Sequence, residues 1–369
     1  MPVGEYRAPA RDPRLITDVS GSDTHARLAA VLGADDNQRE REGHTRHMEE
    51  VPSFETVRKM RSGAWARRLV PKLSRASARE AMVGYLLILP WLVGYLGLIM
   101  GPTLASGVLA FTRYDIMSPP QFVGLRNFQE AFFQDSLFWQ SLKVTGIYTI
   151  AAVPLRMLGA FTFALLLNQN VKGLSIFRTV YYLPAVVSGV AVAFVWKWLL
   201  DPNYGLVNAL LYYVGIQGPQ WFASPDWALP SFIIVSLWTV GGSMITYLAG
   251  LQSVPTTLYE AAEIDGAGRW RKLVSVTIPM ISPVLLFEVV ITMIHSFQVF
   301  TAAYVITNGG PMYSTLFYLL YLYQNGFKYL RMGYASALAW VLFVIILGFT
   351  ILTFRLTSQR VYYEGEARR

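Results

Sequence analysis

The stretch Thr257-Leu258-Tyr259-Glu260-Ala261-Ala262-Glu263-Ile264-Asp265-Gly266-Ala267-Gly268 is a short polar interruption between two long apolar runs. Thr257 stands three residues before Glu260, which is the spacing of a capping box, and Pro255 precedes the start. Gly266 supplies the stop, because glycine enters the left-handed C-cap conformation without steric penalty. The pattern predicts a capped helix of about eight residues, roughly 12 Å long. One face of that helix carries Leu258, Ala261, Ala262 and Asp265. The two alanines on this face would let another backbone approach closely, so the helix is suited to enter a groove.

The composition around this stretch is that of a membrane protein. Of 369 residues, 54% are hydrophobic and 15% are charged, and the apolar residues are gathered into long runs. The chain has no cysteine, which excludes disulfides, thiolate metal sites and cysteine nucleophiles. The net charge of +8 comes from basic residues that flank the apolar runs, so it indicates membrane topology and not nucleic-acid binding.

Six apolar runs each approach the ~20 residues that a helix needs to cross a hydrocarbon core of ~30 Å. We therefore expect an all-α, polytopic membrane protein with six transmembrane helices. The predicted spans are Met82–Leu104, Leu142–Leu167, Phe177–Leu199, Leu229–Leu251, Pro279–Ala303 and Tyr334–Phe354.

The lysines and arginines predict the orientation of these spans. The loops on the side of the 257–268 stretch hold most of them: Arg67, Arg68, Lys72, Arg75, Arg79, Lys172, Arg178, Arg269, Arg271, Lys272, Arg355, Arg360, Arg368 and Arg369. The opposite loops hold Arg113, Arg126, Lys328 and Arg331. By the positive-inside rule, both termini and the 257–268 stretch are cytoplasmic. The predicted organisation is a cytoplasmic, partly disordered extension (1–80), a permease-like membrane domain (81–357) and a cytoplasmic tail (358–369).

Several motifs resemble one family. Glu260-Ala261-Ala262, Asp265-Gly266-Ala267, Ile278-Pro279 and Pro283 resemble the EAA loop of membrane permease subunits of binding-protein-dependent ABC importers of type I, in the carbohydrate branch of maltose, glycerol-phosphate and multiple-sugar permeases. The resemblance extends over roughly residues 82–357 but not over the first 80 residues. Its further motifs are residues 168–184, 201–208, 307–315 and 333–337.

The resemblance implies a function and a set of partners. Tyr259, Glu260, Ala261, Ala262, Asp265, Gly266 and Ala267 would form the coupling helix that docks on a separate ATPase. The chain would then be half of a translocation path in the inner membrane. Its partners would be a second, sister permease, an ATPase dimer that holds ATP-Mg, an extracytoplasmic sugar-binding protein and the lipid bilayer. The chain itself would bind no cofactor and no nucleic acid.

No catalytic constellation accompanies these motifs. The sequence has no phosphate-binding G-x-x-x-x-G-K-[ST], so we expect no ATP hydrolysis on this chain, and it is interpreted as a transport subunit and not an enzyme. His295 is interpreted as a satisfied interior histidine, and His44 and His47 as part of a solvated face, so no metal site is predicted.

Two charges lie inside predicted spans. Arg156 follows Pro154 in the second span and Glu288 lies in the fifth, each about 14–16 Å from the cytoplasmic end at ~1.5 Å per residue. An uncompensated charge at that depth is unfavourable, so we hypothesise that the two residues pair directly or through water. The alternative is that each faces an aqueous cavity separately.

The outer half of the bundle offers side chains suited to sugars, which bind to aromatic faces and to hydroxyl or amide groups. The candidates for the substrate path are Trp238, Phe297, Gln298, Tyr304 and Asn308, with ordinary helix packing as the alternative. A secondary transporter or channel would also have six spans, but it has no use for a capped, alanine-rich docking helix. The sequence does not identify the sugar.

Overall fold

The computed structural model describes residues 75–169 and 172–357. The predicted tail 358–369 and most of the predicted extension 1–80, including His44 and His47, lie outside these residues. The chain divides into two units, Met1–Ile88 and Leu89–Arg369. Only the start of one helix is described in the first unit, so the packing below is that of the second.

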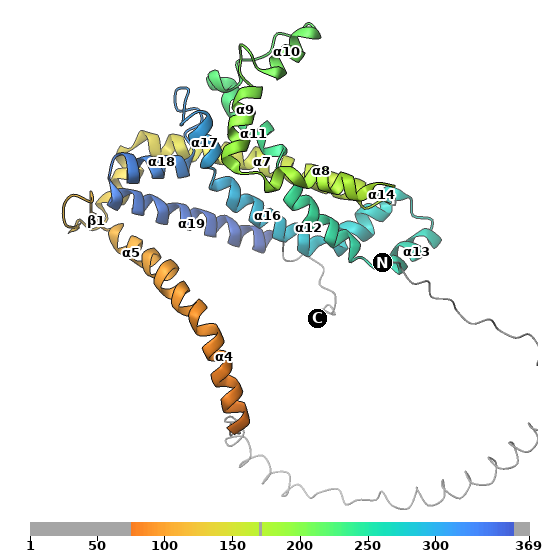
Figure 1. Cartoon of the computed structure of the whole chain (residues 1–369), viewed down its shortest axis with the longest axis horizontal. Coiled ribbons are helices and arrows are strands. Elements are labelled where there is room, and N and C mark those ends of the chain that lie inside the picture. Colours follow the sequence, from red (N-terminus) through yellow and green to blue (C-terminus); the bar gives the residue numbers. More distant parts are fainter. Residues whose placement is uncertain (1–74, 170–171, 358–369) are drawn as a thin grey trace, which may run out of the picture. The chain divides into compact units, whose positions relative to one another are not determined.

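The described chain is almost entirely helical (Figure 1). Short π-helical turns (η1, η2, η4 and η5) and the 3₁₀ turn η3 interrupt or extend several helices. The elements are α4 (Arg75–Gly94), η1 (Tyr95–Met100), α5 (Gly101–Leu109), β1 (Thr112–Arg113), β2 (Gln121–Phe122), α6 (Arg126–Gln129), η2 (Glu130–Gln134), α7 (Ser136–Leu167), α8 (Leu174–Val186), α9 (Gly189–Leu199), α10 (Leu206–Tyr213), η3 (Trp221–Ala223), α11 (Pro225–Leu237), α12 (Gly241–Gln252), α13 (Thr256–Ile264), α14 (Arg269–Lys272), η4 (Leu273–Thr277), α15 (Ile278–Met280), α16 (Ser282–Phe297), α17 (Thr301–Ile306), α18 (Tyr318–Tyr323), η5 (Gln324–Lys328) and α19 (Met332–Thr357). Strands β1 and β2 pair antiparallel, with Thr112 opposite Phe122.

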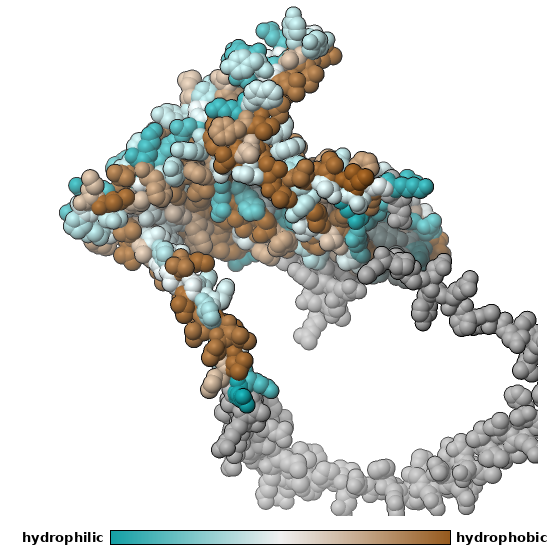
Figure 2. All heavy atoms as spheres, viewed as in Figure 1, coloured by the Kyte–Doolittle hydropathy of each residue, from teal (hydrophilic) through white to brown (hydrophobic). Residues whose placement is uncertain are grey.

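Four of the six predicted spans are continuous helical segments. They run over Arg79–Leu109, Ser136–Leu167, Ser282–Ile306 and Met332–Thr357, and each is long and apolar enough to cross a bilayer. Apolar side chains cover much of the surface of α4 (Figure 2), and many of those on α8 and α19 are also exposed. In water such a surface would be unfavourable, whereas lipid solvates it.

The other two predicted spans are bent, which the apolar pattern did not predict. Helices α8 and α9 meet at 97°, and α11 and α12 meet at 44°. The first bend follows Pro184 within α8, and Val187 and Ser188 have extended backbone angles that end the helical hydrogen bonding. Taken together, each pair is long and apolar enough for one span.

The long helix α7 is the centre of the bundle. Its side chains contribute to three apolar clusters, which contain Phe138 against α18 and α19, Ala160 against α12, and Tyr148 against α11 and α17. Helices far apart in the sequence thereby pack on one scaffold, and the segments between them are held in fixed positions.

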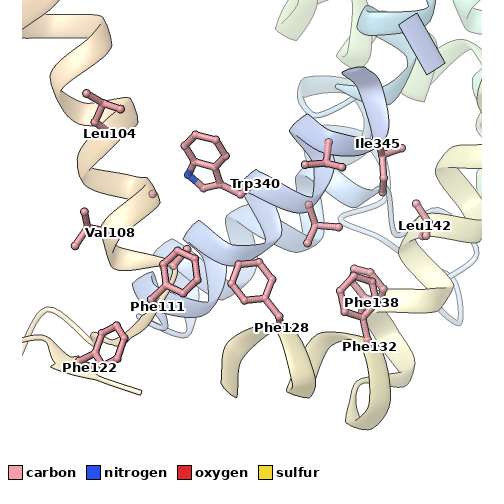
Figure 3. Close-up of a pocket in the computed structure, with 14 residues that line it drawn as sticks. Leu104, Val108, Phe111, Phe122, Phe128, Phe132, Phe138, Leu142, Trp340 and Ile345 are labelled. Atoms are coloured by element: carbon pink, nitrogen blue, oxygen red, sulfur yellow. The ribbon is translucent and has the colours of Figure 1, made fainter. Parts of the chain in front are cut away.

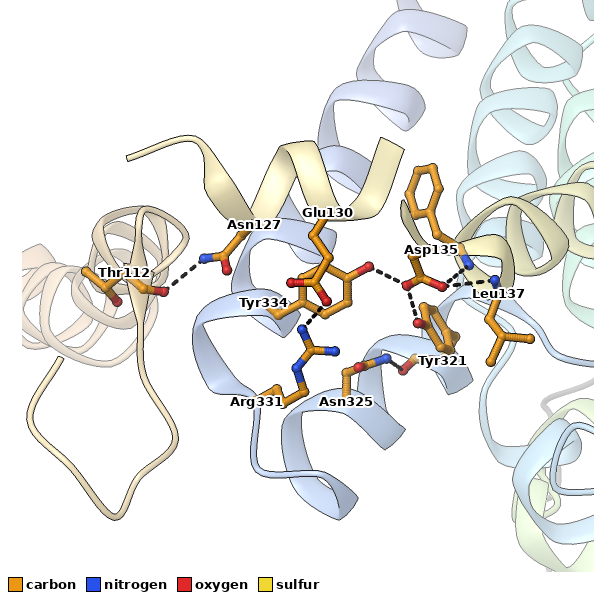
Figure 4. Close-up of polar contacts among 10 residues, drawn as sticks. Thr112, Asn127, Glu130, Asp135, Leu137, Tyr321, Asn325, Arg331 and Tyr334 are labelled. Carbon is orange, nitrogen blue, oxygen red and sulfur yellow. Dashed lines mark hydrogen bonds and ion pairs between the residues drawn. The ribbon is translucent and has the colours of Figure 1, made fainter. Parts of the chain in front are cut away.

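Polar contacts fasten the end of the bundle where α7 begins (Figure 4). Asp135 caps α7, because its Oδ1 accepts hydrogen bonds from the backbone N–H groups of Leu137 (2.9 Å) and Phe138 (3.1 Å). Its Oδ2 accepts hydrogen bonds from the hydroxyls of Tyr321 and Tyr334. One carboxylate therefore joins α7, α18 and α19.

A second set of contacts at this end ties in the segment after α5. Glu130 forms an ion pair with Arg331, whose guanidinium lies 4.4 Å from the ring centroid of Tyr334. Gly333 allows a close approach to this segment, because a Cβ there would lie 2.0 Å from the carbonyl oxygen of Thr112. The start of α19 thus packs directly against strand β1.

Candidate functional site

The 257–268 stretch forms a short helix, α13, at the opposite end of the bundle from β1 (Figure 1). The predicted capping box is wrong: α13 begins at Thr256 after Pro255, and no side chain caps it. Pro255 is the N-cap, with φ −59° and ψ 132°, so the helix starts two residues earlier than the threonine–glutamate spacing indicates. Thr257 and Glu260 are then ordinary exposed helical residues.

The predicted glycine stop is confirmed. Gly266 has φ +74°. Its N–H donates to the carbonyl oxygen of Glu263 (2.9 Å), and the N–H of Ala267 donates to that of Ala262 (2.8 Å). This pair of bonds is the Schellman arrangement, which gives the last carbonyls of the helix a partner. The direction of the chain after α13 is therefore fixed.

Two side-chain contacts hold α13 against the helices behind it. The hydroxyl of Tyr259 lies 3.0 Å from Oγ1 of Thr277, and its ring packs on the cluster around Tyr247. Lys272 donates to Oε2 of Glu263 at 2.8 Å, and this bond and charge lower the pKa of the Glu263 carboxyl. Tyr259, predicted as part of the coupling surface, therefore anchors the helix from the inside.

Three of the four residues of the predicted face of α13, Leu258, Ala261 and Asp265, are exposed. Ala262 is half-buried, whereas Glu260, Ala261 and Ile264 are exposed. Ile264 is 88% exposed, and Trp270 in the following helix is 80% exposed. Sequence reasoning missed both. The signal was present in two large apolar side chains within an otherwise polar loop, which is typical of an interaction surface.

A cavity of about 600 Å³ lies in the middle of the bundle, between α7, the α8–α9 break, α11, α12 and α16. Arg156 and Glu288 both line it, together with hydroxyl and amide side chains. The polar side chains of its wall are Tyr148, Arg156, Ser236, Thr239, Ser243, Glu288, Thr292, His295, Gln298 and Thr301.

The hypothesised direct pair of Arg156 and Glu288 is not formed. Within residues 75–169 and 172–357 the ion pairs are Lys272–Glu263 and Arg331–Glu130. Glu288 is 4% exposed, and Nε of Arg156 is buried without a hydrogen-bond partner in the described chain. The two charged side chains therefore line one shared cavity without a direct contact.

The structure brings one of the five predicted substrate-path residues to this cavity. Gln298 lines it. Phe297 is buried against Phe349, Tyr304 stacks on Phe300, and the remaining two lie elsewhere: Trp238 against Trp196 and Asn308 near Gln324. His295 was interpreted as a satisfied interior residue, but its side chain is exposed and lines the cavity. The position of a residue along a span gives its depth but not the helical face on which it lies. That face decides whether the side chain lines the cavity or packs against other helices.

These features define a class of protein. The described chain has four continuous and two bent apolar segments, a polar cavity lies between α7, the α16 segment and the two bent segments, and a rigidly capped helix projects at one end. No group of three or more histidine, aspartate or glutamate side chains that could hold a metal ion occurs among the described residues. The arrangement is that of a multi-pass membrane transport subunit.

The comparisons give the family. Residues 147–360 match the binding-protein-dependent transport system inner membrane component, and the chain belongs to this family. It is 43% identical over 299 residues to the probable ABC transporter permease protein YesP of Bacillus subtilis, covering 80% of this chain and 96% of the relative. It is 34% identical to the trehalose/maltose transport system permease protein MalF of Thermococcus litoralis, covering 76% and 95% of the two chains.

A solved structure has the same fold. It is a bacterial ABC transporter involved in the import of the acidic polysaccharide alginate, with a TM-score of 0.68, 25% identity, and coverage of 76% of this chain and 96% of that chain. The chain is thus a transmembrane permease subunit of an ABC transporter, a transport component and not an enzyme. In this family ATP hydrolysis belongs to a separate subunit, as the resemblance of the 257–268 stretch implies.

Proposed function

We propose that this chain forms half of the translocation path of an ATP-driven importer for a carbohydrate, and that α13 couples it to a separate ATPase. The observation that carries the coupling proposal is the geometry of α13: an exposed face on a helix that is anchored on its inner side and closed by a Schellman arrangement. A helix held in this way transmits a push as rigid-body motion of the bundle.

The proposed ATPase contact includes Glu260, Ala261, Asp265, Gly266 and Ala267. Ile264 and Trp270 extend it, since these exposed apolar side chains suit a partner pocket. Tyr259 and Ala262 act through the position of the helix, because they face inward or are half-buried. ATP-Mg would bind on the partner, whose closure would draw the docking helix inward and tilt the spans.

A carbohydrate is the substrate class that the site and the relatives support together. Two of the proteins named above are described as transporters of carbohydrates: MalF of trehalose and maltose, and the solved structure of the acidic polysaccharide alginate. The cavity of this chain is lined by hydroxyl and amide groups and by the aromatic ring of Tyr148. These groups belong to Ser236, Thr239, Thr292 and Gln298. Such groups exchange hydrogen bonds with sugar hydroxyls, so the cavity is suited to a polar, uncharged or mixed ligand.

The distribution of basic residues supports an orientation with both termini and α13 in the cytoplasm. One docking helix serves one ATPase subunit, so a second permease must supply the other. Substrate would arrive from an extracytoplasmic sugar-binding protein at the opposite face, where the long segment 201–227 lies. The path would continue past the cavity of this chain.

Co-purification tests the coupling proposal. Ile264→Glu places a charge on the exposed apolar face of α13 and should abolish retention of the ATPase by the purified permeases, with membrane insertion unchanged. The matched control Ile264→Val keeps an apolar side chain and should retain the ATPase. Retention of a stoichiometric ATPase by the glutamate variant would contradict the proposed docking surface.

A further inference from the structure

An apolar groove of about 760 Å³ lies at the end of the bundle opposite α13 (Figure 3). Its walls come from α5, the start of α7 and the middle of α19, and its volume falls within the ~300–1,000 Å³ of small-molecule sites. The side chains that define it include Val108, Phe128, Phe138, Leu142, Trp340 and Val344. Nothing in the transport function described above uses this groove.

The groove lies at the depth of lipid hydrocarbon. Trp340 and Ile345 are 8 and 13 residues from the start of α19 at Met332, which corresponds to about 12 and 20 Å along the helix. Half of a ~30 Å hydrocarbon core spans a similar depth. In the orientation given under the proposed function, on which the choice of leaflet rests, this is the outer leaflet.

A polar pocket of about 260 Å³ adjoins the groove on its water-facing side. The short helix α6 forms a shared wall, because Phe128 lines the groove while Arg126 and Asn127 line the polar pocket. The Nδ2 of Asn127 donates to the carbonyl oxygen of Ala110 at 2.8 Å, and Ala110 also lines the groove. The two spaces are therefore held in a fixed relation to each other.

The polar pocket has unpaired positive charge. Its cations are Arg113, Arg126 and Arg331, and its carboxylates are Asp115 and Glu130, so the balance of three against two is +1. Glu130 is paired with Arg331, and Asp115 Oδ1 accepts hydrogen bonds from the N–H and hydroxyl of Ser118 at 2.9 and 2.6 Å. The exposed guanidinium groups of Arg113 and Arg126 make no hydrogen bond or ion pair with any other described residue.

We propose that the groove and the polar pocket together hold one anionic phospholipid, with an acyl chain in the groove and the headgroup phosphate at Arg113 and Arg126. Guanidinium groups bind phosphate oxygens in pairs, which a lysine cannot do with the same geometry. An apolar groove at this depth is filled by an acyl chain, because an empty groove would lose the dispersion contacts of its lining. The exposed Met117 and Phe122 on the adjoining loop are placed to enter the same leaflet.

Lipid retention by the intact transporter tests this proposal. The complex is placed in nanodiscs of phosphatidylglycerol that carries a photoreactive group on one acyl chain, and labelled peptides and retained lipids are counted by mass spectrometry. We expect label on α5 and α19. Val344→Trp fills the groove from an exposed position and should remove one retained lipid per subunit. Arg113→Ala with Arg126→Ala should weaken retention by about 30-fold, or about 2 kcal/mol.

Lys328→Ala is the matched control, since Lys328 is an exposed basic residue on the same face that does not line the polar pocket. It should leave retention unchanged. The proposal is overturned if all three variants retain the same amount of lipid, or if the control loses as much lipid as the arginine variant. It is also overturned if a photoreactive amino acid placed at position 344 labels a permease chain and no lipid. The readout is lipid alone, so retention of the ATPase by the Ile264→Glu variant, or its absence from the unaltered permease, would refute the proposed coupling without affecting this result. Label that enters only from the cytoplasmic leaflet of oriented proteoliposomes would overturn the orientation.

Discussion

Replacing Gly266 by valine is expected to uncouple ATP hydrolysis from uptake without preventing membrane insertion. At φ +74° a residue with a Cβ is strained by ~1–2 kcal/mol, and β-branching places valine at or above the upper end of that range. No atom lies within 4 Å of the position that the added Cβ would take, so the effect is on the backbone and not on packing. A penalty of about 2 kcal/mol shifts the equilibrium of the C-cap by about 30-fold.

The relaxed C-cap loses the hydrogen bonds from Gly266 N–H to Glu263 and from Ala267 N–H to Ala262. We expect the amide of Ala267 to exchange with solvent about 30-fold faster, because this bond alone protects it. In proteoliposomes that contain the whole complex, uptake per ATP hydrolysed should fall by a factor of about 10 or more, as the face of α13 no longer keeps one orientation toward the ATPase.

Gly268→Val is the matched control. Gly268 lies in the same loop, with φ −68° and ψ 171°, and its added Cβ also meets no atom within 4 Å. A side chain is tolerated in this extended conformation, so coupling should be retained. Equal effects of the two valine substitutions would show that side-chain bulk in the loop, and not the left-handed backbone of Gly266, explains the loss, and would refute the reasoning.

Three further predictions concern other contacts. Tyr259→Phe removes the hydroxyl contact with Thr277 and should lower the stability of the docked helix by about 1 kcal/mol, seen as faster hydrogen exchange in α13 with the fold retained; an unchanged exchange rate would show that ring packing alone holds the helix. Asp135→Asn leaves two tyrosine hydroxyls and the cap of α7 with a weaker acceptor, so the purified subunit should lose about 2 kcal/mol of stability, measured by a lower Tm, whereas Asp226→Asn, in an exposed first turn, should have little effect. Because Arg156 and Glu288 line one cavity without a direct ion pair, a double-mutant cycle of Arg156→Met and Glu288→Gln on uptake should show an interaction energy of about 0.5–1.5 kcal/mol, and a value near zero would show that the two charges act separately.

The positions of the spans were readable from the sequence because the bilayer imposes a length on every apolar run. The predicted run Tyr334–Phe354, for example, lies within α19 (Met332–Thr357). The Gly266 stop was equally readable, because a single residue determines it. Both inferences rest on local chemistry, which does not depend on the rest of the fold.

The helix faces and the bends were not readable in the same way. Gln298 and Phe297 are neighbours in the sequence, yet the first lines the cavity and the second is buried in a core cluster. This assignment depends on which helices pack on α16, and that is set by contacts with residues more than a hundred positions away, such as Phe138 in the same cluster. The α8–α9 bend likewise needs its neighbours, since Pro154 in α7 produces no comparable break.

The bend between α8 and α9 gives the central cavity a wall made partly of main chain. Pro184, Ala185, Val187 and Gly189 line the cavity at this point, where the helical hydrogen bonding stops and the last carbonyls of α8 have no partner within their own helix. Peptide groups are the same whatever the side chain, so mutation alters this wall little. If the proposed carbohydrate occupies this cavity, changes in cargo preference among transporters of this architecture should therefore accumulate at Thr292, His295 and Gln298 of the α16 segment.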